Sequence, residues 1–316
     1  MLKFKDVYIN DYFTLVGPLE KECDLKNANV FLNDYYYGES TIEKAEIKMQ
    51  RTVLNQLIKN NKPGIVIGGE LSNQLGTTNM NLADQGVPYM GIYSACATSS
   101  QGIIMIANMI SSKAIKDGIF ITSSHNLVAE KQLRFPVEYG APKPIRSTFT
   151  ATVAIGMKLS NKPSKIKVIN GTIGAVVDSA VKDVHNVGAV MAPSAVDTLL
   201  RHLKSTNTNL NDYDLILTGD LGKVGTTIFK KLLTKYHKLQ IDNHLDAGCL
   251  LYKNLEYSGA SGPAVLPLIF FNKILANKKY KKILYLATGA LYSPLLVFQK
   301  NPLPAVTHAV TLEVIG

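Results

Sequence analysis

Two stretches of the chain nearly repeat one another: Ile65-Val66-Ile67-Gly68-Gly69-Glu70-Leu71 and, in the second half of the sequence, Leu215-Ile216-Leu217-Thr218-Gly219-Asp220-Leu221. Each stretch is an apolar, β-rich run that stops at a glycine followed by a carboxylate. Buried parallel strands end in this way where open α/β sheets bind their ligands. The repeat therefore predicts an α/β protein with a duplicated half-molecule.

A second pair of strands follows the first: Gly118-Ile119-Phe120-Ile121-Thr122-Ser123-Ser124-His125 and Lys282-Ile283-Leu284-Tyr285-Leu286-Ala287-Thr288-Gly289. We therefore expect a first half over residues 1–160, with an inserted segment at 123–150, and a second half over residues 161–316. The two halves should meet at a shared cleft. The inserted segment is polar, aromatic and basic, and long connections inside a domain are usually functional or contact a partner.

Hydrophobic periodicity predicts the elements between these strands. Residues 40–59 place their apolar side chains on one face, which indicates an amphipathic surface helix with Ser40 or Thr41 as N-cap. Residues 101–115 are apolar around most of the circumference, which indicates a buried helix. The residues before 40 read as irregular and polar. The remaining expected strands are 87–93, 151–158, 165–173, 249–252 and 307–314, and the remaining helices are 195–203, 226–236 and 262–277.

The composition is that of a globular protein with a large core. The chain has 316 residues, of which 46% are hydrophobic and 18% charged, and this balance excludes disordered and fibrous classes. No apolar run approaches the length of a membrane span. The first ten residues carry Lys3, Lys5 and Asp6 where a signal peptide needs an apolar stretch. The sequence therefore predicts a cytoplasmic protein.

The formal net charge is +10, from 34 Lys and Arg against 24 Asp and Glu. Much of this charge is spread through loops, which favours a solvated face, although diffuse positive charge also attracts anionic ligands or an anionic membrane surface. No basic stripe is interleaved with aromatic residues, and no helix-turn-helix or RNA-binding signature occurs. Nucleic acid is therefore not an expected partner.

Three cysteines, Cys23, Cys96 and Cys249, are too few and too scattered for a disulfide framework or a zinc site. We interpret Cys23 and Cys249 as packing residues. Cys96 lies where a strand turns into a hydrophobic helix, and the free N–H groups and dipole of a helix start stabilise a thiolate or a bound anion. The alternative is that the small residues of Ser94-Ala95-Cys96-Ala97 only let the helix and the sheet pack closely.

Four runs of the sequence resemble the stage V sporulation protein AD (SpoVAD) family, a branch of the thiolase-like superfamily. The resemblance covers most of the chain from about Ile65 onward, whereas the first 60 residues match loosely. The second run is specific enough to separate this branch from ordinary thiolases. The runs are Ser94-Ala95-Cys96-Ala97-Thr98-Ser99, Ser123-Ser124-His125-Asn126 continuing through residues 129–140, Asp212-Tyr213-Asp214-Leu215-Ile216-Leu217-Thr218-Gly219-Asp220-Leu221, and Ala287-Thr288-Gly289-Ala290-Leu291-Tyr292-Ser293-Pro294.

The resemblance implies a fold and a function. The fold is a five-layer αβαβα sandwich of two βαβαβαββ halves, with the cysteine at the N-terminus of a buried helix. The function is that of a binding protein for dipicolinic acid, free or as its calcium chelate, which serves uptake into the developing spore and spore germination. The implied partners are other membrane proteins of the spore channel, which would hold the chain peripherally at the forespore or spore inner membrane. Relatives in this fold commonly form homodimers.

Residues opposite Cys96 indicate whether catalysis persists. Ketoacyl-synthase-like members of the fold pair the cysteine with a histidine and an asparagine, or a second histidine, from the other half. This chain has Asp220 where such an enzyme carries histidine, and residues 258–262 contain no asparagine. An ionised Asp220 would repel a thiolate and could not donate a proton to an oxyanion. We therefore expect a non-catalytic protein; the alternatives are an active acyltransferase or ketoacyl-synthase III-like condensing enzyme using Cys96, and a structural partner that has lost its ligand.

A cluster of polar residues follows the strand that ends at His125. Guanidinium groups grip carboxylates in bidentate fashion, and hydroxyls and amides supply further donors, so the cluster could bind a flat dicarboxylate. A structural role for His125 and a solvated surface around Arg134, Lys143 and Arg146 are the alternatives. The full predicted ligand-binding set is Cys96, Ser99, Ser124, His125, Asn126, Arg134, Tyr139, Asp220 and Ser261.

We expect no cofactor and no metal site of the protein's own. Asp183, His185 and Asp197 lack close carboxylate spacing, and nothing in the sequence resembles a calcium loop. Calcium would arrive only as part of the ligand complex.

Overall fold

The main sheet repeats one strand order twice. The first set of strands comprises β2 (Tyr8–Val16), β4 (Val66–Gly68), β5 (Tyr89–Gly91), β6 (Asp117–Ser124) and β8 (Val153–Ser160). The second comprises β9 (Ile166–Thr172), β11 (Leu215–Thr218), β12 (His244–Asp246), β14 (Lys282–Ala290) and β15 (Pro304–Val314). In the computed structural model, which describes residues 1–25, 27–59, 62–133 and 142–315, the order is β5-β4-β6-β8-β2 and then β12-β11-β14-β15-β9.

The pairing directions repeat as well. β4 runs parallel to β5 and β6, and β11 runs parallel to β12 and β14. The last two strands of each set, β8 with β2 and β15 with β9, are antiparallel. The two sets join where β2 pairs with β9, at Tyr8 with Lys167 and Ile9 with Ile166. The matching order confirms the predicted duplicated α/β fold. The predicted boundary at residue 160 falls between β8 and β9 and stays a prediction.

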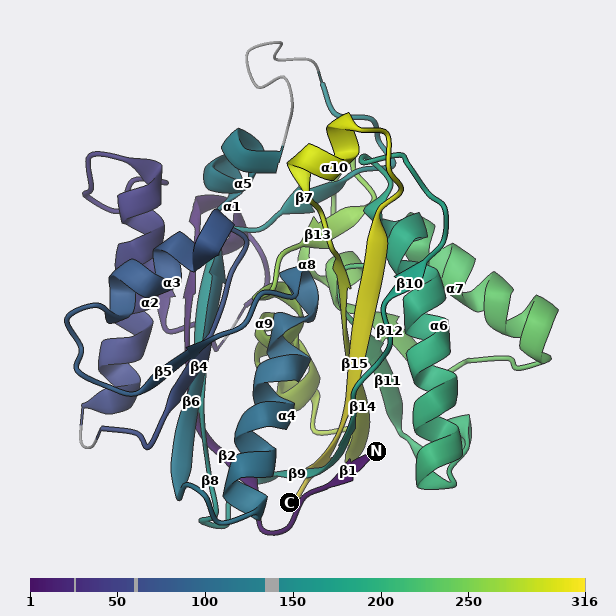
Figure 1. Ribbon diagram of the computed structural model, residues 1–316, viewed down its shortest axis with the longest axis horizontal. Helices are drawn as coiled ribbons and strands as arrows, with labels where there is room; N and C mark the ends of the chain where they lie inside the picture. Colours follow the sequence, from purple (N-terminus) through teal and green to yellow (C-terminus); the bar gives the residue numbers. More distant parts are fainter. Residues whose placement is uncertain (26, 60–61, 134–141, 316) are drawn as a thin grey trace.

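Helices complete five layers (Figure 1). The central layer, between the two sets of strands, holds α4 (Thr98–Ser111) and α9 (Val265–Ile269), which continues as a π turn, Phe270–Ile274, and a 3₁₀ turn, Leu275–Asn277. The outer layers are α2 (Ile42–Ile58) and α3 (Gly76–Leu82) on the first sheet and α6 (Val187–Thr206) and α7 (Gly222–His237) on the second. No helix of the described residues is long and apolar enough to cross a lipid bilayer.

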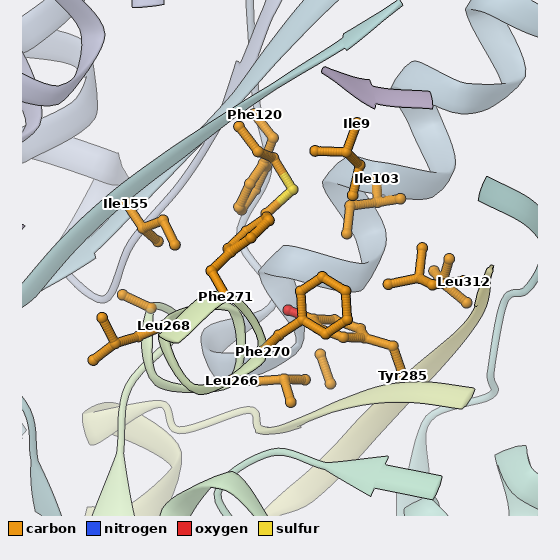
Figure 2. Close-up of a cluster of buried hydrophobic side chains, with 14 of the residues drawn as sticks. Ile9, Ile103, Phe120, Ile155, Leu266, Leu268, Phe270, Phe271, Tyr285 and Leu312 are labelled. Carbon is orange, nitrogen blue, oxygen red and sulfur yellow. The ribbon is translucent and has the colours of Figure 1, made fainter. Parts of the chain in front are cut away.

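The core lies where the central helices touch both sheets. Figure 2 shows side chains from α4, β6, α9, β14 and β15 meeting there. The ring of Phe271 stacks on Tyr12 of β2 at 4.0 Å between centroids, and Phe270 meets Tyr285 of β14 edge to face at 5.8 Å. Burying such aromatic rings contributes a large share of core stability. The central layer therefore holds the first and second halves together.

Short elements gather at the end of the molecule where the parallel strands stop (Figure 1, top). These elements are α5 (Asn126–Leu133), β7 (Thr148–Thr150), β13 (Gly259–Ser261) and α10 (Pro294–Phe298). β7 and β13 form a separate parallel pair that joins the inserted segment of the first half to the second half. The remaining elements are β1 (Leu2–Lys3), β3 (Val30–Phe31), β10 (Val177–Asp178), α1 (Pro18–Lys21), α8 (Ala247–Leu251) and the 3₁₀ turns Asn73–Leu75, Ala95–Ala97 and Leu210–Asp212.

The structure corrects the expectation of an irregular N-terminus. β2 is a central strand, paired with β8 over most of its length. Its register shifts between Ile9 and Asp11, where a bulge places the adjacent polar residues Asn10 and Asp11 on the surface. A bulge interrupts the alternation of apolar and polar side chains, so the strand has no clear period of two in the sequence.

The strand expected at 249–252 is also wrong, because these residues fall mainly in α8. Asp246 caps this helix by accepting a hydrogen bond from the backbone N–H of Cys249 at 3.1 Å, and the strand of this region, β12, ends at that same aspartate. A four-residue apolar run fits a strand or a buried helical turn equally well. Three expected helices start too late. α4 and α7 begin with small or polar residues that carry little hydrophobic signal, and α6 begins before Pro193, which lies inside it.

Candidate ligand-binding site

A cavity of about 500 Å³ lies between the halves at the end of the sheets, within the usual range for small-molecule sites. Its wall combines residues that were distant in the sequence. The first half contributes Leu71, Tyr93, Ala95, Cys96, Ala129, Glu130, Leu133, Lys143, Ser147, Thr148 and Thr150; the second half contributes Val184, His185, Val187, Met191, Ser261, Ala290, Leu291, Tyr292, Val297, Phe298 and Lys300. The wall is therefore mostly apolar and aromatic, with polar and charged side chains from both halves among them.

Cys96 reaches the cavity from a tight turn before α4. Ala95 has a φ of +49°, in the left-handed region that a residue with a side chain seldom adopts. The turn is held from the other half by Gly289 of β14, where an added Cβ would lie 2.4 Å from the carbonyl oxygen of Ser94. Cys96 itself is half-buried and lines the cavity. Both halves therefore fix the direction of the thiol.

Asp220, at the end of β11, lies against the thiol of Cys96. Its side chain is buried, and its Oδ2 accepts a hydrogen bond from the backbone N–H of Gly262 at 2.9 Å. Burial, reinforced by the charge of Asp246, raises the pKa of Asp220 well above its usual range. Burial and the neighbouring Asp220 carboxyl raise the pKa of the Cys96 thiol as well. Burial therefore favours the protonated, uncharged form of both groups.

The raised pKa of Asp220 differs from what the sequence predicted. We expected an ionised Asp220 that repels a thiolate, whereas burial favours the protonated carboxyl. The pKa of Cys96 is raised as well, and a thiol is a far weaker nucleophile than a thiolate. In the described residues, Cys96 is therefore an unactivated thiol.

Asp246 holds the loop that carries Asp220. Its Oδ1 accepts from the backbone N–H groups of Gly222 and Cys249, at 2.9 and 3.1 Å, and its Oδ2 accepts from Leu221 N–H at 3.1 Å. The hydroxyl of Thr218 also donates to Oδ2, at 2.7 Å. These bonds fix a turn in which Asp220 adopts a φ of +66°. Asp246 is therefore a positioning residue for the site.

Ser261, like Cys96, is a predicted residue on the cavity wall. It ends β13, and its hydroxyl accepts a hydrogen bond from Thr148 of β7 at 2.9 Å. The next residue, Gly262, has a φ of +130°, and an added Cβ would lie 2.4 Å from Oγ of Ser124. The structure thus brings Cys96, Asp220 and Ser261 together at one end of the cavity.

The family is decided by a comparison with known proteins: the model of the family described as stage V sporulation protein AD matches residues 2–313. The chain belongs to that family. It is similar to the stage V sporulation protein AD of Bacillus subtilis (strain 168), with 32% identity over 321 residues that cover 98% of this chain and 95% of the relative. The resemblance inferred from four short runs therefore holds over nearly the whole length, including the N-terminal residues that matched loosely.

Two solved structures share the fold of this chain. A crystal structure of OleA from Xanthomonas campestris superposes with a TM-score of 0.63 at 12% identity, covering 99% of each chain. The 3-oxoacyl-(acyl carrier protein) synthase III of Xanthomonas oryzae pv. oryzae gives a TM-score of 0.59 at 12% identity, covering 98% of this chain and 100% of that one. Identities this low show the thiolase fold alone, and they confirm the predicted architecture.

Three further predicted residues of this SpoVAD-family chain lie behind the cavity wall. The hydroxyl of Ser99 accepts a hydrogen bond from Tyr285 in the core at 2.9 Å. Ser124 donates to the carbonyl oxygen of Ala151 at 2.7 Å, and the side-chain amide of Asn126 donates to Thr150 at 3.0 Å. These side chains are engaged in structural bonds that shape the site from behind. Arg134 and Tyr139 lie outside the described residues.

His125 is not among the residues that line the cavity with Cys96. Its Nε2 lies 2.8 Å from the carbonyl oxygen of Tyr35, so Nε2 carries the hydrogen, and Nδ1 accepts no bond from the described residues. Burial lowers the pKa of His125. The ring borders a second cavity of about 10 Å³, which shares Leu71 and Ala129 with the larger one. A ligand held by both His125 and Cys96 stays a prediction.

Three charged residues on the cavity wall, among those that the structure describes, were not in the predicted set: Glu130, Lys143 and Lys300. Lys143 forms an ion pair with Glu130 of α5, and both side chains are largely buried. Burial lowers the pKa of Lys143 to about 8. The sequence suggested a solvated surface for Lys143 because it does not show that Lys143 lies on the cavity wall. Ala129, Glu130 and Leu133 lie on one face of α5. Their helical spacing was the feature of the sequence that could have indicated a shared surface.

Proposed function

We propose that this chain is a non-catalytic thiolase-fold binding protein for dipicolinic acid, free or as its calcium chelate. It serves uptake of the acid into the developing spore as part of a membrane channel complex. The observation that carries the proposal is the buried Asp220 against Cys96, in the place where a condensing enzyme needs a histidine. In the described residues, Cys96 lines a cavity, and the side chain against its thiol is a carboxyl that raises rather than lowers the thiol pKa. Family membership supports spore physiology, and the resemblance supplies the ligand.

The chemistry of the cavity suits a flat aromatic dicarboxylate. Apolar and aromatic side chains such as Tyr93, Tyr292 and Phe298 offer faces for a ring. Lys143 and the N-terminal turn of α4 beside Cys96 offer positive potential for carboxylates. A hydroxyl of Ser261 adds a neutral donor at the same end. The ring and its two carboxylates would thus each meet a matching part of the wall.

Calcium enters this proposal only with the ligand. The described residues contain no group of three or more His, Cys, Asp or Glu side chains placed to hold a metal ion. On the cavity wall, Glu130 is engaged with Lys143. Calorimetry with sodium dipicolinate and with an equimolar calcium chelate separates the two forms of the ligand.

Binding is tested by calorimetry on the wild type, Cys96→Ala and Cys249→Ala. Cys249 is the matched control, because it is a half-buried cysteine away from the cavity wall. We expect binding to the wild type and to Cys249→Ala, and weaker binding to Cys96→Ala. Failure of both ligand forms to bind the wild type would overturn the proposal. Equal binding by all three proteins would move the site away from Cys96.

One observation favours the second candidate, an acyltransferase or condensing enzyme: the sulfur of Cys96 lines the cavity. A raised thiol pKa opposes it, since acyl transfer needs a thiolate. Mass spectrometry after incubation with acyl-CoA decides between the two. The proposal expects an unmodified Cys96, whereas a stable acyl adduct with product formation would establish the enzyme.

We assign membrane association to protein partners rather than to lipid. The basic residues are scattered, so attraction to an anionic surface would be weak and screened by salt over roughly 10 Å. Fractionation of sporulating cells in low and high salt tests this route. Retention on the forespore membrane in high salt supports protein partners, and release by moderate salt or binding without partners contradicts them. A homodimer stays a prediction.

A further inference from the structure

We propose that Lys143 is the cation that binds a carboxylate of the ligand, and that Glu130 occupies Lys143 while the cavity is empty. The inference rests on the proposed function, because it names how the same cavity recognises its anion. Binding would be an exchange of partners: the ligand carboxylate replaces the Glu130 carboxylate at the Lys143 ammonium. No covalent bond forms or breaks.

The first support is location. Lys143 and Glu130 line the same cavity as Cys96, so a ligand there can reach both. Their side chains are 15% and 21% exposed and are joined by an ion pair. The other lysine on the wall, Lys300, is exposed to solvent. Lys143 is therefore the better shielded of the two lysines that line the cavity in the described residues.

The second support is the contrast with other ion pairs on the same helix. Lys131, next to Glu130 on α5, pairs with Glu43 at 2.5 Å, but these side chains are 63% and 41% exposed. Exposed pairs of this kind contribute little because water and salt screen them. A pair on the wall of a cavity is screened less, so its partner exchange has a larger effect on binding.

The third support is electrostatic. Burial holds the pKa of Lys143 at about 8 although Glu130 is its partner. The ion pair with Glu130 therefore does not fully offset the free-energy cost of removing water from the Lys143 ammonium. A dicarboxylate that enters the cavity adds negative charge and favours the protonated lysine. Binding near pH 8 should then take up a proton at Lys143.

The exchange predicts opposite effects of two substitutions. Glu130→Gln removes the internal competitor and a repulsive charge, so dipicolinate should bind at least about threefold more tightly. Lys143→Met removes a charge-assisted bond, so the ligand should bind at least about tenfold more weakly. Glu43→Gln breaks the exposed pair on the same helix and should change the affinity by less than about twofold.

Calorimetry with sodium dipicolinate, without calcium, tests these values on the full-length chain. Titrations at pH 8 in buffers of different ionisation enthalpy measure the proton uptake, which should occur in the wild type and disappear in Lys143→Met. If Lys143→Met does not fold, two measurements still test the exchange: proton uptake by the wild type and the affinity of Glu130→Gln for dipicolinate. Weaker or unchanged binding by Glu130→Gln, or no proton uptake by the wild type, overturns the exchange.

The outcomes separate the partner exchange at Lys143 from the proposed binding of dipicolinate. No binding of dipicolinate to the wild type contradicts both. Wild-type binding that Lys143→Met leaves unchanged contradicts the exchange alone, and the ligand is then held elsewhere on the wall.

Discussion

The carboxyl of Asp220 lies against the thiol of Cys96, and each comes from the loop that follows a strand of a different half. The two loops meet because β4, β5, β11 and β12 hold equivalent places in a repeated sheet. In this contact, burial raises the pKa of both groups. Of the two residues, Cys96 lines the cavity of about 500 Å³.

Asp220→Asn should make Cys96 more reactive. The Asp220 carboxyl contributes to the raised pKa of the Cys96 thiol, so its removal increases the thiolate fraction at a given pH. The rate of alkylation by iodoacetamide at pH 8, followed by peptide mass spectrometry, should rise at Cys96. Cys249, whose pKa is raised to about 12 by burial, serves as the internal control. An unchanged rate at Cys96 would show that Asp220 does not set its protonation.

Binding of dipicolinate should weaken at high pH. The ammonium of Lys143 is present below its pKa of about 8 and is lost as the pH rises through that value. Affinity in calorimetry should therefore be higher at pH 7 than at pH 9, and Lys143→Met should remove most of the difference. A wild-type affinity that does not change between these pH values would contradict a role for the ammonium.

Gly262→Ala should destabilise the protein and weaken binding. The residue combines a φ of +130° with a Cβ position 2.4 Å from Oγ of Ser124, and its N–H holds Asp220. Backbone strain alone contributes about 1–3 kcal/mol. Gly38→Ala is the control, because Gly38 has a φ of +74° but its Cβ would have only Lys48 Nζ nearby, at 3.6 Å. Urea unfolding should show a larger loss of unfolding free energy in Gly262→Ala than in Gly38→Ala. Equal losses would show that the contact with Ser124 does not add to the cost.

Glu46→Gln should stabilise the protein increasingly as the pH rises. Glu46 is buried beside Ser123, and burial, with the nearby Glu70, raises its pKa from 4.5 to about 8. Between these values the unfolded chain loses a proton that the folded chain keeps, so wild-type stability falls as the pH rises. Urea unfolding measures the free energy of unfolding of Glu46→Gln relative to the wild type. This stability advantage of Glu46→Gln should be at least about 1 kcal/mol larger at pH 8.5 than at pH 5.

The control for that titration is Glu43→Gln. Glu43 lies on the same helix, and its hydrogen bond to Lys131 lowers rather than raises its pKa. Glu43 is also the smallest contributor to the raised pKa of Glu46, so Glu43→Gln should give a much smaller gain in stability than Glu46→Gln between pH 5 and pH 8.5. A Glu46→Gln variant that follows the wild type at every pH would mean that Glu46 ionises normally in the folded chain.

The repeated strands and the contact of Cys96 with Asp220 could be predicted from the sequence because both depend on local pattern. Each apolar run ends at a glycine and a polar residue, and equal places in a repeated sheet bring such ends together. β2 could not be predicted in this way, since a bulge after Ile9 breaks its alternation.

The side-chain directions at the end of β6 explain why His125 is not among the residues that line the cavity with Cys96. Ser124 points toward Gly262 of the second half, whereas His125 points toward Tyr35 and a different cavity. Successive side chains along a strand lie on opposite faces, so neighbours in sequence need not share a site. The pair of Lys143 with Glu130 was missed for the opposite reason, because the two residues are far apart in the sequence and yet form an ion pair.

A crystal structure of the chain with dipicolinate tests the central claim most directly. The account predicts that the ligand occupies the cavity between the halves, with its ring against the aromatic wall and one carboxylate within hydrogen-bonding distance of Lys143 Nζ. Glu130 should have moved away from that lysine, and Cys96 should be unmodified. A ligand bound elsewhere, or an empty cavity at concentrations that saturate binding in solution, would contradict the account.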